Sequence, residues 1–427
     1  MLGAAIVLML SGLSSCETGV IRKNVAGAEQ PAQKGSIVTV LGSLASKDQA
    51  IFEQAMLPFE EETGIDVVYE STDTFVSLIE SRMATDKLPD VVMISQPGLM
   101  ADYAESGLLV PLTRFLDIRA LRTAYSDDWI DLGSVDEVPY ALWYRASVKS
   151  LVWYRPTAFE AKGYDIPSTW PDMIALSDRI VAEGGTPWCI GLESGEATGW
   201  PATDWVEDIL LRTAGPEAYS QWIDHRLLFD SPPVLQAFDE FGRFLRSPQY
   251  VQGGATQSVT LSYEKATTGI LTDPPECYMH RQGSFAASFF PEEKAARVDY
   301  DVFPLPGIDT RFGMPILVAG DAIALFHDTP ESRAFMAYIA SPTPHEIAAG
   351  LGGFISPHKQ IPLEAYPNVV TQNIAQILID ADTIEFDASD MMPGYVGTGT
   401  FWQGMVDFAQ GKSAEEVAKE IDQSWPD

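Results

Sequence analysis

The sequence has few or none of the residues on which several classes of protein depend. Only five of its 427 residues are histidine, and none of them form an HxxxH or HExxH pair, so no zinc site is predicted. No GxGxxG, GxxxxGKS or GxxxxGKT stretch occurs, so no dinucleotide or nucleoside triphosphate site is predicted. Residues 191–195 lack the register of a GxSxG nucleophile elbow, which disfavours serine acyl transfer. We therefore expect neither a metal ion nor a cofactor.

Basic residues are scarce. The chain has 27 Lys and Arg against 60 Asp and Glu, a net charge of −33, and its basic residues form no cluster. Nucleic acids and anionic membrane surfaces attract positively charged proteins. Electrostatics therefore predict that nucleic acid is not a partner and disfavour binding to anionic membrane surfaces.

No apolar run is long enough to span a membrane. The first 13 residues are uncharged and apolar, but a helix of that length covers about 20 Å of a hydrocarbon layer roughly 30 Å thick. The next residues, Leu13-Ser14-Ser15-Cys16, resemble the lipobox of bacterial lipoprotein signals, although no Lys or Arg precedes the apolar run. The resemblance implies a signal over residues 1–16, a lipid on Cys16 and a flexible tether over residues 17–35. The alternative is a buried N-terminal helix.

Apart from Cys16, the chain has two cysteines, Cys189 and Cys277. In an oxidising envelope compartment two such thiols usually pair. Closing a loop of this length would contribute roughly 4–5 kcal/mol in the chain-entropy model. Two reduced core residues are the alternative.

Residues 37–112 show the pattern of alternating strands and helices. Apolar runs at 37–41, 65–69 and 88–94 predict strands buried on both faces, and helical periodicity follows each of them. Consecutive β-α-β units form parallel sheets, in which ligands bind beyond the carboxyl ends of the strands. This rule nominates the loops that carry Ser43, Thr72 with Asp73, and Gln96. The alternative is that these are ordinary turn and capping residues.

A chain of 427 residues is expected to form two domains. A strand over 138–144 is predicted to leave the first sheet and one over 151–156 to enter another, so we place a boundary near residues 144–150. Further strands are predicted at 187–192 and from residue 269 toward Cys277, and a strand pair broken at Gly320 is predicted over 316–325. Helices are expected at 169–182, 202–213, 232–246, 331–339, 371–379, 400–408 and 414–421.

Aromatic and isolated polar residues gather on the predicted loops at strand ends. Sugars present C–H faces that pack on indole rings and hydroxyl rims that need fixed donors and acceptors, so this mixture favours a carbohydrate cleft. Each tryptophan taken singly is more often a core residue. The group comprises Trp143, Tyr144, Trp200, Tyr278 and Trp402 with Asp73, Gln96, Lys149, Glu193, Asp273 and Asp321.

Several short motifs resemble a known family. Residues 58–65, 88–92 and 103–108 are similar to the extracellular solute-binding proteins of ATP-driven sugar importers, in the maltodextrin-binding-like branch, and residues 391–417 resemble the C-terminal signature of that family. Residues 199–205 and 272–277 look like those of its α-glucoside-binding members, which also carry the two cysteines.

The resemblance implies an α/β protein with a two-lobed periplasmic-binding-protein-like fold and a hinge, each lobe being a mostly parallel sheet flanked by helices. We expect residues 36–144 with 318–355 in the first lobe, and 145–317 with 356–427 in the second. Sugar binds between such lobes and favours their closed arrangement. The residues expected to contact it are Ser43, Thr72, Asp73, Gln96, Trp143, Lys149, Glu193, Trp200, Asp273, Glu276, Gly320, Asp321, Gly353 and Trp402.

The leading hypothesis is thus a monomeric, lipid-anchored sugar-binding subunit, without catalytic activity, that delivers an α-glucoside or oligosaccharide to the permease and ATPase of an ABC importer. It would reside in the periplasm or on the outer face of the cytoplasmic membrane. One rival is a surface glycoside hydrolase, using carboxylate pairs such as Glu193 with Asp204 or Asp273 with Glu276. Another is a binder of a non-sugar solute such as a polyol or a peptide.

Overall fold

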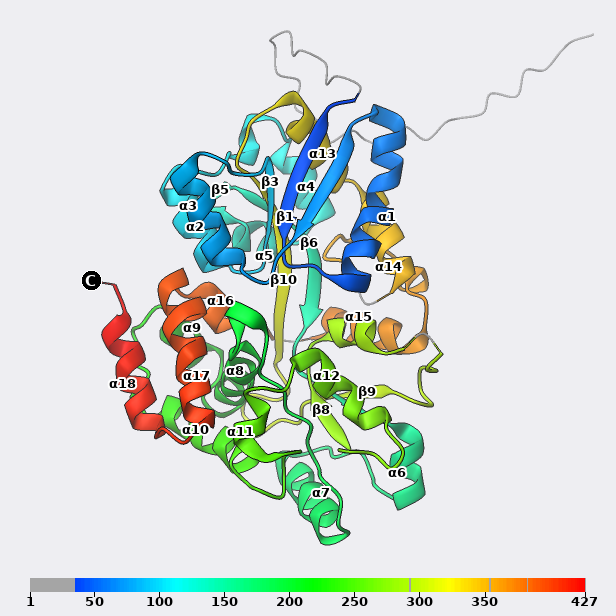
Figure 1. Ribbon diagram of the computed structural model, residues 1–427, viewed down its shortest axis with the longest axis vertical. Coiled ribbons are helices and arrows are strands. Elements are labelled where there is room, and N and C mark those ends of the chain that lie inside the picture. Colours follow the sequence, from blue (N-terminus) through cyan, green and yellow to red (C-terminus); the bar gives the residue numbers. More distant parts are fainter. Residues whose placement is uncertain (1–34, 292, 353–354, 382, 427) are drawn as a thin grey trace, which may run out of the picture.

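The computed structural model describes residues 35–291, 293–352, 355–381 and 383–426. It is an elongated α/β molecule with two lobes, one above the other in Figure 1. Two separate clusters of buried apolar side chains form the cores. One surrounds the first strands and their helices, and the other surrounds the helices of the opposite half.

The first lobe begins with the predicted alternation of strands and helices. Strand β1 (Ile37–Gly42) pairs in parallel with β2 (Asp66–Ser71) and with β3 (Val91–Ile94). Helix α1 (Ser46–Thr63) ends at Gly64, whose φ of 71° is a left-handed conformation that glycine adopts without strain. Helices α2 (Phe75–Thr85) and α3 (Pro97–Glu105) follow β2 and β3. The alternation of strands and helices predicted from residue 37 is therefore confirmed.

Two long strands connect the lobes. Strand β6 (Ala141–Val148) pairs antiparallel with β10 (Ile316–Leu325), which also pairs antiparallel with β3 and parallel with β11 (Ile384–Phe386). Figure 1 shows β6 and β10 running from the upper lobe toward the lower one.

The predicted break at Gly320 is wrong, because β10 is one continuous and fully buried strand. A Cβ built on Gly320 would lie 2.3 Å from the carbonyl oxygen of Arg145. Glycine is therefore needed here because β6 lies so close to β10, and not because the chain turns. The irregularity in the pairing is a register shift between Asp321 and Ala322.

The sheet of the second lobe differs from expectation. Strand β7 (Leu151–Tyr154) lies between β8 (Met279–Arg281) and β9 (Asp301–Pro304) and is antiparallel to both, so the sheet described for this lobe is antiparallel and not mostly parallel. The strands are short, and helices that carry many aromatic side chains supply most of the core. Trp205 stacks on Phe241 with 5.6 Å between ring centroids. These helices are α8 (Trp200–Ala214), α10 (Pro232–Leu245), α17 (Trp402–Ala409) and α18 (Ala414–Ser424).

Two further strand predictions are wrong. Residues 187–192 form only isolated bridges, at Trp188, and residues 269–271 form the 3-10 turn η3 (Gly269–Leu271). These two segments pack closely without forming strands: a Cβ built on Gly191 would lie 2.6 Å from the carbonyl oxygen of Ser262, and one on Gly269 would lie 2.4 Å from Cys189 Sγ. The predicted disulfide between Cys189 and Cys277 is confirmed, with 5.5 Å between the Cα atoms.

The other expected helices form close to their predicted bounds. Apart from four short 3-10 helices, η1 (Leu112–Arg114), η2 (Gly195–Ala197), η4 (Ser284–Phe289) and η5 (Leu363–Ala365), the remaining elements are α4 (Ile118–Ala124), α5 (Asp127–Leu132), β4 (Ser134–Val135), β5 (Val138–Pro139), α6 (Pro156–Lys162), α7 (Trp170–Ala182), α9 (Pro216–Ile223), α11 (Gly254–Ser258), α12 (Tyr263–Thr268), α13 (Pro330–Ile339), α14 (Pro342–Leu351), α15 (Val369–Asp380), α16 (Ala388–Met391) and the π-helix η6 (Tyr395–Phe401).

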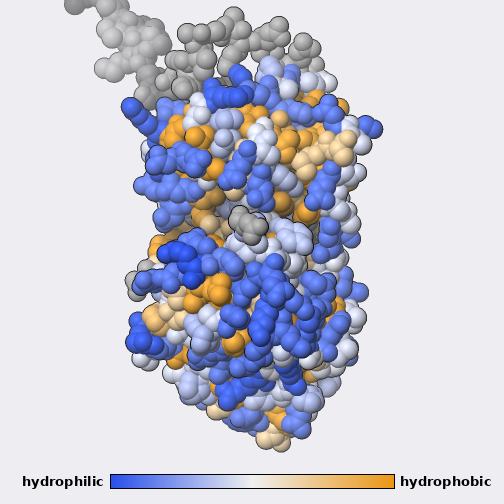
Figure 2. All heavy atoms as spheres, turned by 90° about the vertical axis from the view of Figure 1, so that its left-hand side faces the viewer, coloured by the Kyte–Doolittle hydropathy of each residue, from blue (hydrophilic) through white to orange (hydrophobic). Residues whose placement is uncertain are grey.

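Hydrophilic residues predominate on the face shown in Figure 2, where apolar residues form only small patches. In the described part of the chain, no helix has both the length and the apolar composition needed to cross a membrane. Cys16 and residues 17–34 lie outside the described residues. The residue boundaries proposed for the two lobes stay a prediction.

The lobes also meet along one side, where α3 contacts the segment that follows α16. A Cβ built on Gly98 of α3 would lie 1.8 Å from the carbonyl oxygen of Met392, and the Asp102 carboxylate accepts a hydrogen bond from the Gly394 N–H at 3.2 Å. Because Met392 belongs to the second core and α3 to the first, Gly98 is required for this contact between lobes.

Gly98→Ala should therefore lower the free energy of unfolding by about 1–3 kcal/mol, since the added methyl group meets backbone and not a movable side chain. Gly350→Ala in α14 is the matched control, because the nearest atom to its Cβ would be the carbonyl oxygen of Ala365, at an ordinary contact distance of 3.6 Å. We expect that change to be neutral or to stabilise by up to about 1 kcal/mol. Urea denaturation measures both, and equal effects would contradict the role of Gly98.

Candidate functional site

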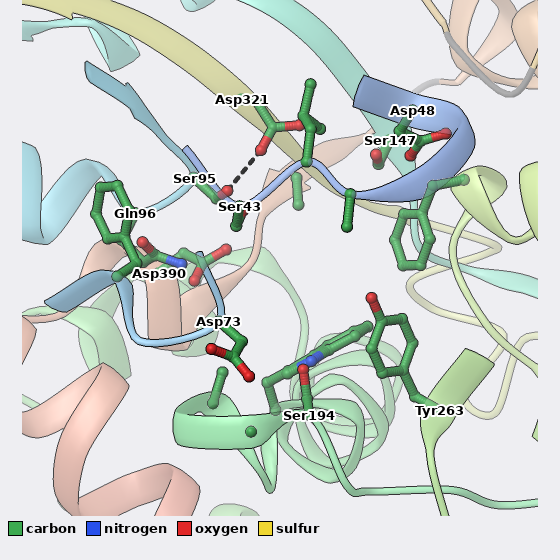
Figure 3. Close-up of a pocket in the computed structure, with 18 of the residues that line it drawn as sticks. Ser43, Asp48, Asp73, Ser95, Gln96, Ser147, Ser194, Tyr263, Asp321 and Asp390 are labelled. Atoms are coloured by element: carbon green, nitrogen blue, oxygen red, sulfur yellow. Dashed lines mark hydrogen bonds between the residues drawn. The ribbon is translucent and has the colours of Figure 1, made fainter. Parts of the chain in front are cut away.

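A cavity of about 700 Å³ lies between the lobes. The loops after β1, β2 and β3 line it from the first lobe, as the rule for parallel sheets predicts. Residues 193–197, Trp200 and residues 262–264 line it from the second. Figure 3 shows side chains from both lobes pointing into this space, among them Asp73, Gln96 and Tyr263.

The structure brings most of the predicted contact residues together at this cavity. Those that line it are Ser43, Thr72, Asp73, Gln96, Lys149, Glu193, Trp200, Gly320, Asp321 and Trp402. Their contact with a ligand remains a prediction.

Three of the predicted contact residues lie elsewhere, and so do Tyr144 and Tyr278 of the aromatic group, which are buried in the cores. Trp143 is buried in the first core, where its ring packs against Trp129 and Phe386 at centroid distances of 5.3 and 5.0 Å. Asp273 and Glu276 are exposed and do not line the cavity; Glu276 accepts a hydrogen bond from Gln252 at 2.6 Å. Gly353 lies outside the described residues.

The two cavity tryptophans come from neighbouring segments of the second lobe. A Cβ built on Gly199, which has a φ of 114°, would lie 2.2 Å from the carbonyl oxygen of Trp402, so this glycine lets the segment before Trp200 approach α17. Tyr263 packs edge-on to Trp200 at 5.1 Å. The indole N–H of Trp402 is buried and has no hydrogen-bond partner among the described residues. A buried donor of this kind gains from a ligand that accepts its hydrogen bond.

An ion-pair cluster forms the side of the cavity that belongs to the first lobe. Arg145 binds Asp48 at 2.6 Å and Asp321 at 2.5 Å, and the Ser95 hydroxyl donates to Asp321 at 2.6 Å. Burial alone would lower the pKa of Arg145, but Asp321 and Asp48 outweigh it and raise that pKa. The guanidinium is therefore charged and held in place by two carboxylates.

A second ion network lies beneath Trp200. The Lys149 ammonium is 4.4 Å from the centroid of this ring and binds Asp204 at 3.0 Å and Asp387 at 3.2 Å. Arg281 extends the network by binding Asp204 at 3.1 Å and Asp208 at 2.8 Å. Lys149 follows β6 directly, so the network lies where the chain passes between the lobes.

The network is neutral only if some of its carboxyl groups hold protons. Burial and neighbouring carboxylates raise the pKa of Glu207 and of Asp390 well above the usual values, so both are protonated at neutral pH. Burial also raises the pKa of Asp204, to about 7, whereas Lys149 and hydrogen bonds outweigh burial at Asp387 and lower its pKa. Oxygen atoms of Asp204, Glu207 and Asp387 approach one another within 4.8 Å, but Lys149 already supplies a positive charge there.

Neither carboxylate pair proposed for glycoside hydrolysis meets in the cavity. Asp204 is 1% exposed and is bound by Lys149 and Arg281, so it does not line the cavity with Glu193. Asp273 and Glu276 are outside it. The structure therefore gives no support to these acid and nucleophile pairs.

Sequence reasoning missed several lining residues, namely Asp48, Arg145, Glu196, Tyr263, Glu264, Phe285, Asp387 and Asp390. Arg145 is a charged residue inside an otherwise uncharged strand, and this alone was a usable signal. Residues 262–264 and Phe285 carry no such signal, because only the packing of the second lobe brings them to the cavity.

The model of the bacterial extracellular solute-binding protein family matches residues 41–346. The chain belongs to this family. One relative, the osmoprotective compounds-binding protein GgtB of Synechocystis sp., is 49% identical over 424 residues, which cover 99% of this chain and 98% of GgtB. The α-glucosides-binding periplasmic protein AglE of Rhizobium meliloti is 39% identical over 400 residues, covering 92% and 87%. The resemblance noted from short motifs is confirmed.

Solved structures of solute-binding proteins share the fold at low sequence identity. The solute receptor AcbH, with an exclusive preference for β-D-galactopyranose, has a TM-score of 0.79 at 17% identity and covers 91% of this chain and 98% of its own. Maltose-bound MalE3 of T. maritima has a TM-score of 0.71 at 17% identity, covering 91% and 98%. These likenesses confirm the two-lobed fold of this solute-binding protein.

Lys149→Met should lower the free energy of unfolding by about 3–5 kcal/mol, because Asp204 and Asp387 would stay buried without their shared cation. Lys294→Met is the control: Lys294 pairs with Asp299 at 3.7 Å near the surface, so its loss should cost less than about 1 kcal/mol. Chemical denaturation of both variants tests this. A similar small loss in each would show that the network beneath Trp200 is not a buried ion pair of the expected kind.

Proposed function

We propose that this protein is the substrate-binding subunit of an ABC importer and that it captures an uncharged solute with an α-linked glucose, of the kind used as an osmoprotectant. The observation that carries the proposal is the cavity between the lobes, which joins two tryptophans to fixed carboxylates and hydroxyls. The names of the two relatives, one for osmoprotective compounds and one for α-glucosides, support the same class.

The side chains suit a sugar in a specific way. The exposed part of Trp200 offers an apolar surface to ring C–H groups, and the free N–H of Trp402 offers a donor. Asp73, Glu193 and Gln96 supply acceptors for hydroxyl groups from both lobes. A solute that contacts both lobes only when they are closed shifts the population toward the closed form. The permease subunits would then receive the closed, loaded protein.

The site of action is part of this proposal. We infer that residues 1–16 are a lipoprotein signal and that Cys16 carries the lipid, which holds a monomeric protein in the periplasm or on the outer face of the cytoplasmic membrane. Membership of an extracellular family supports an envelope location.

Cys16→Ser should move the protein from the membrane fraction to the soluble fraction of the cells that express it, because the thiol is the acceptor of the lipid. Ser14→Ala, which retains Cys16, should leave it in the membrane fraction. Immunoblots of the two fractions measure the change. An unaltered distribution of the Cys16→Ser protein would contradict the anchor.

Isothermal calorimetry with α-linked disaccharides, glucosyl polyols, β-linked disaccharides and free polyols tests the ligand class. We expect micromolar or tighter binding by at least one α-linked compound. Trp200→Phe and Trp402→Phe should each weaken it roughly ten-fold, which corresponds to about 1.4 kcal/mol of lost ring contact or hydrogen bonding. Trp425→Phe is the control, because Trp425 stacks on His225 outside the cavity.

Two outcomes would contradict the proposal. The first is no binding by any α-linked compound at millimolar concentration. The second is an affinity that survives both tryptophan changes, which would favour a solute other than a sugar. Sustained turnover of aryl glucosides would instead favour the hydrolase.

A further inference from the structure

The cavity has an uneven distribution of free charge. Its two lining cations are both occupied: Arg145 by Asp48 and Asp321, and Lys149 by Asp204 and Asp387. Each of these cations is therefore bound by two carboxylates at 3.2 Å or less. The cavity therefore offers no free positive charge among the described residues.

Apart from the buried Asp390, whose pKa burial raises well above its usual value, four further lining carboxylates have no such compensation. No ion pair joins them to a Lys, Arg or His in the described ranges of the chain. Lys47 and Lys265 are next to cavity residues in the sequence, but neither lines the cavity. This set, called the acidic rim below, consists of Asp73, Glu193, Glu196 and Glu264.

The acidic rim combines residues of both lobes. A Cβ built on Gly195 would lie 3.3 Å from the Cβ and the carbonyl oxygen of Asp73, and the Glu193 carboxylate accepts a hydrogen bond from the Gly195 N–H at 3.0 Å. Asp73 of the first lobe and Glu193 of the second are thus brought to the same residue, Gly195. In Figure 3 Asp73 extends toward the loop that carries Ser194.

We propose that the acidic rim makes this protein selective against anionic solutes, so that it accepts uncharged glycosides and rejects their phosphorylated or carboxylated forms. Several carboxylates without a cationic partner repel an anion in the cavity, whereas an uncharged hydroxyl gains hydrogen bonds from the same oxygens. The inference rests on the proposed function and specifies its substrate class. It also makes Glu196 and Glu264 specificity-determining residues.

The test compares trehalose with trehalose 6-phosphate, and sucrose with sucrose 6-phosphate, by calorimetry on the full-length protein. At 10 mM salt, where charges interact over about 30 Å, we expect each phosphate ester to bind at least about ten-fold more weakly than its parent sugar. At 0.3 M salt the ratio should shrink about three-fold or more, because the interaction between charges is screened.

Neutralising the acidic rim should shrink the ratio at low salt in the same way. The control removes four carboxylates that do not line the cavity and produces the same change in net charge, so it corrects for the charge of the whole molecule. All eight positions lie at the surface or are half-buried, and thermal unfolding verifies the fold. The test variant is Asp73→Asn, Glu193→Gln, Glu196→Gln and Glu264→Gln, and the control is Asp66→Asn, Glu61→Gln, Glu137→Gln and Glu160→Gln.

The outcomes separate the two proposals. If no uncharged solute of the panel binds, the proposed function fails and this inference fails with it. If esters and parent sugars bind equally well, only the inference is overturned. The inference is also overturned if the esters bind more weakly but the ratio of affinities changes neither with salt nor with the substitutions in the acidic rim. The size of the phosphate group would then be the cause.

Discussion

The site depends most on the ion pairs of the buried Lys149 ammonium. This ammonium lies at the end of β6, where the chain leaves one lobe for the other, and it is held by Asp204 and Asp387 while its charge faces the ring of Trp200. A buried charge is tolerated only with partners in fixed positions. The same contacts therefore fix the connection between the lobes, the segment around Asp387 and the aromatic surface of the cavity.

A similar arrangement supports the opposite wall. Arg145, four residues before Lys149 in the chain, is fixed by Asp48 at the start of α1 and by Asp321 in β10. Both cations pair with carboxylates of the protein, so the cavity presents mainly oxygen acceptors and aromatic rings to a ligand. Such a lining binds hydroxyl groups through acceptors that are already oriented, which limits the entropy lost on binding. Preorganisation and the distribution of charge thus come from the same two cations.

Prediction from the sequence succeeded where a local pattern was sufficient. The first three strands are short, apolar and buried on both faces, so their parallel pairing and the loops that carry Ser43, Asp73 and Gln96 were predictable. The second lobe was harder. Its core is made of aromatic helices and short antiparallel strands, and segments such as residues 187–192 are extended without pairing into a strand. Burial of Trp143 in the core shows the limit of reading aromatics one by one.

The sequence by itself determined the alternating start, most helices, the resemblance to the family and the presence of aromatic and acidic residues suited to a sugar. These follow from periodicity and residue chemistry over short stretches. Only the tertiary structure decided which of those residues share the cavity, that Asp204 is buried beneath Lys149, and that Tyr263, Glu264 and Phe285 join Trp200 there. Such contacts join residues far apart in the chain, and their geometry depends on packing, which no local pattern records.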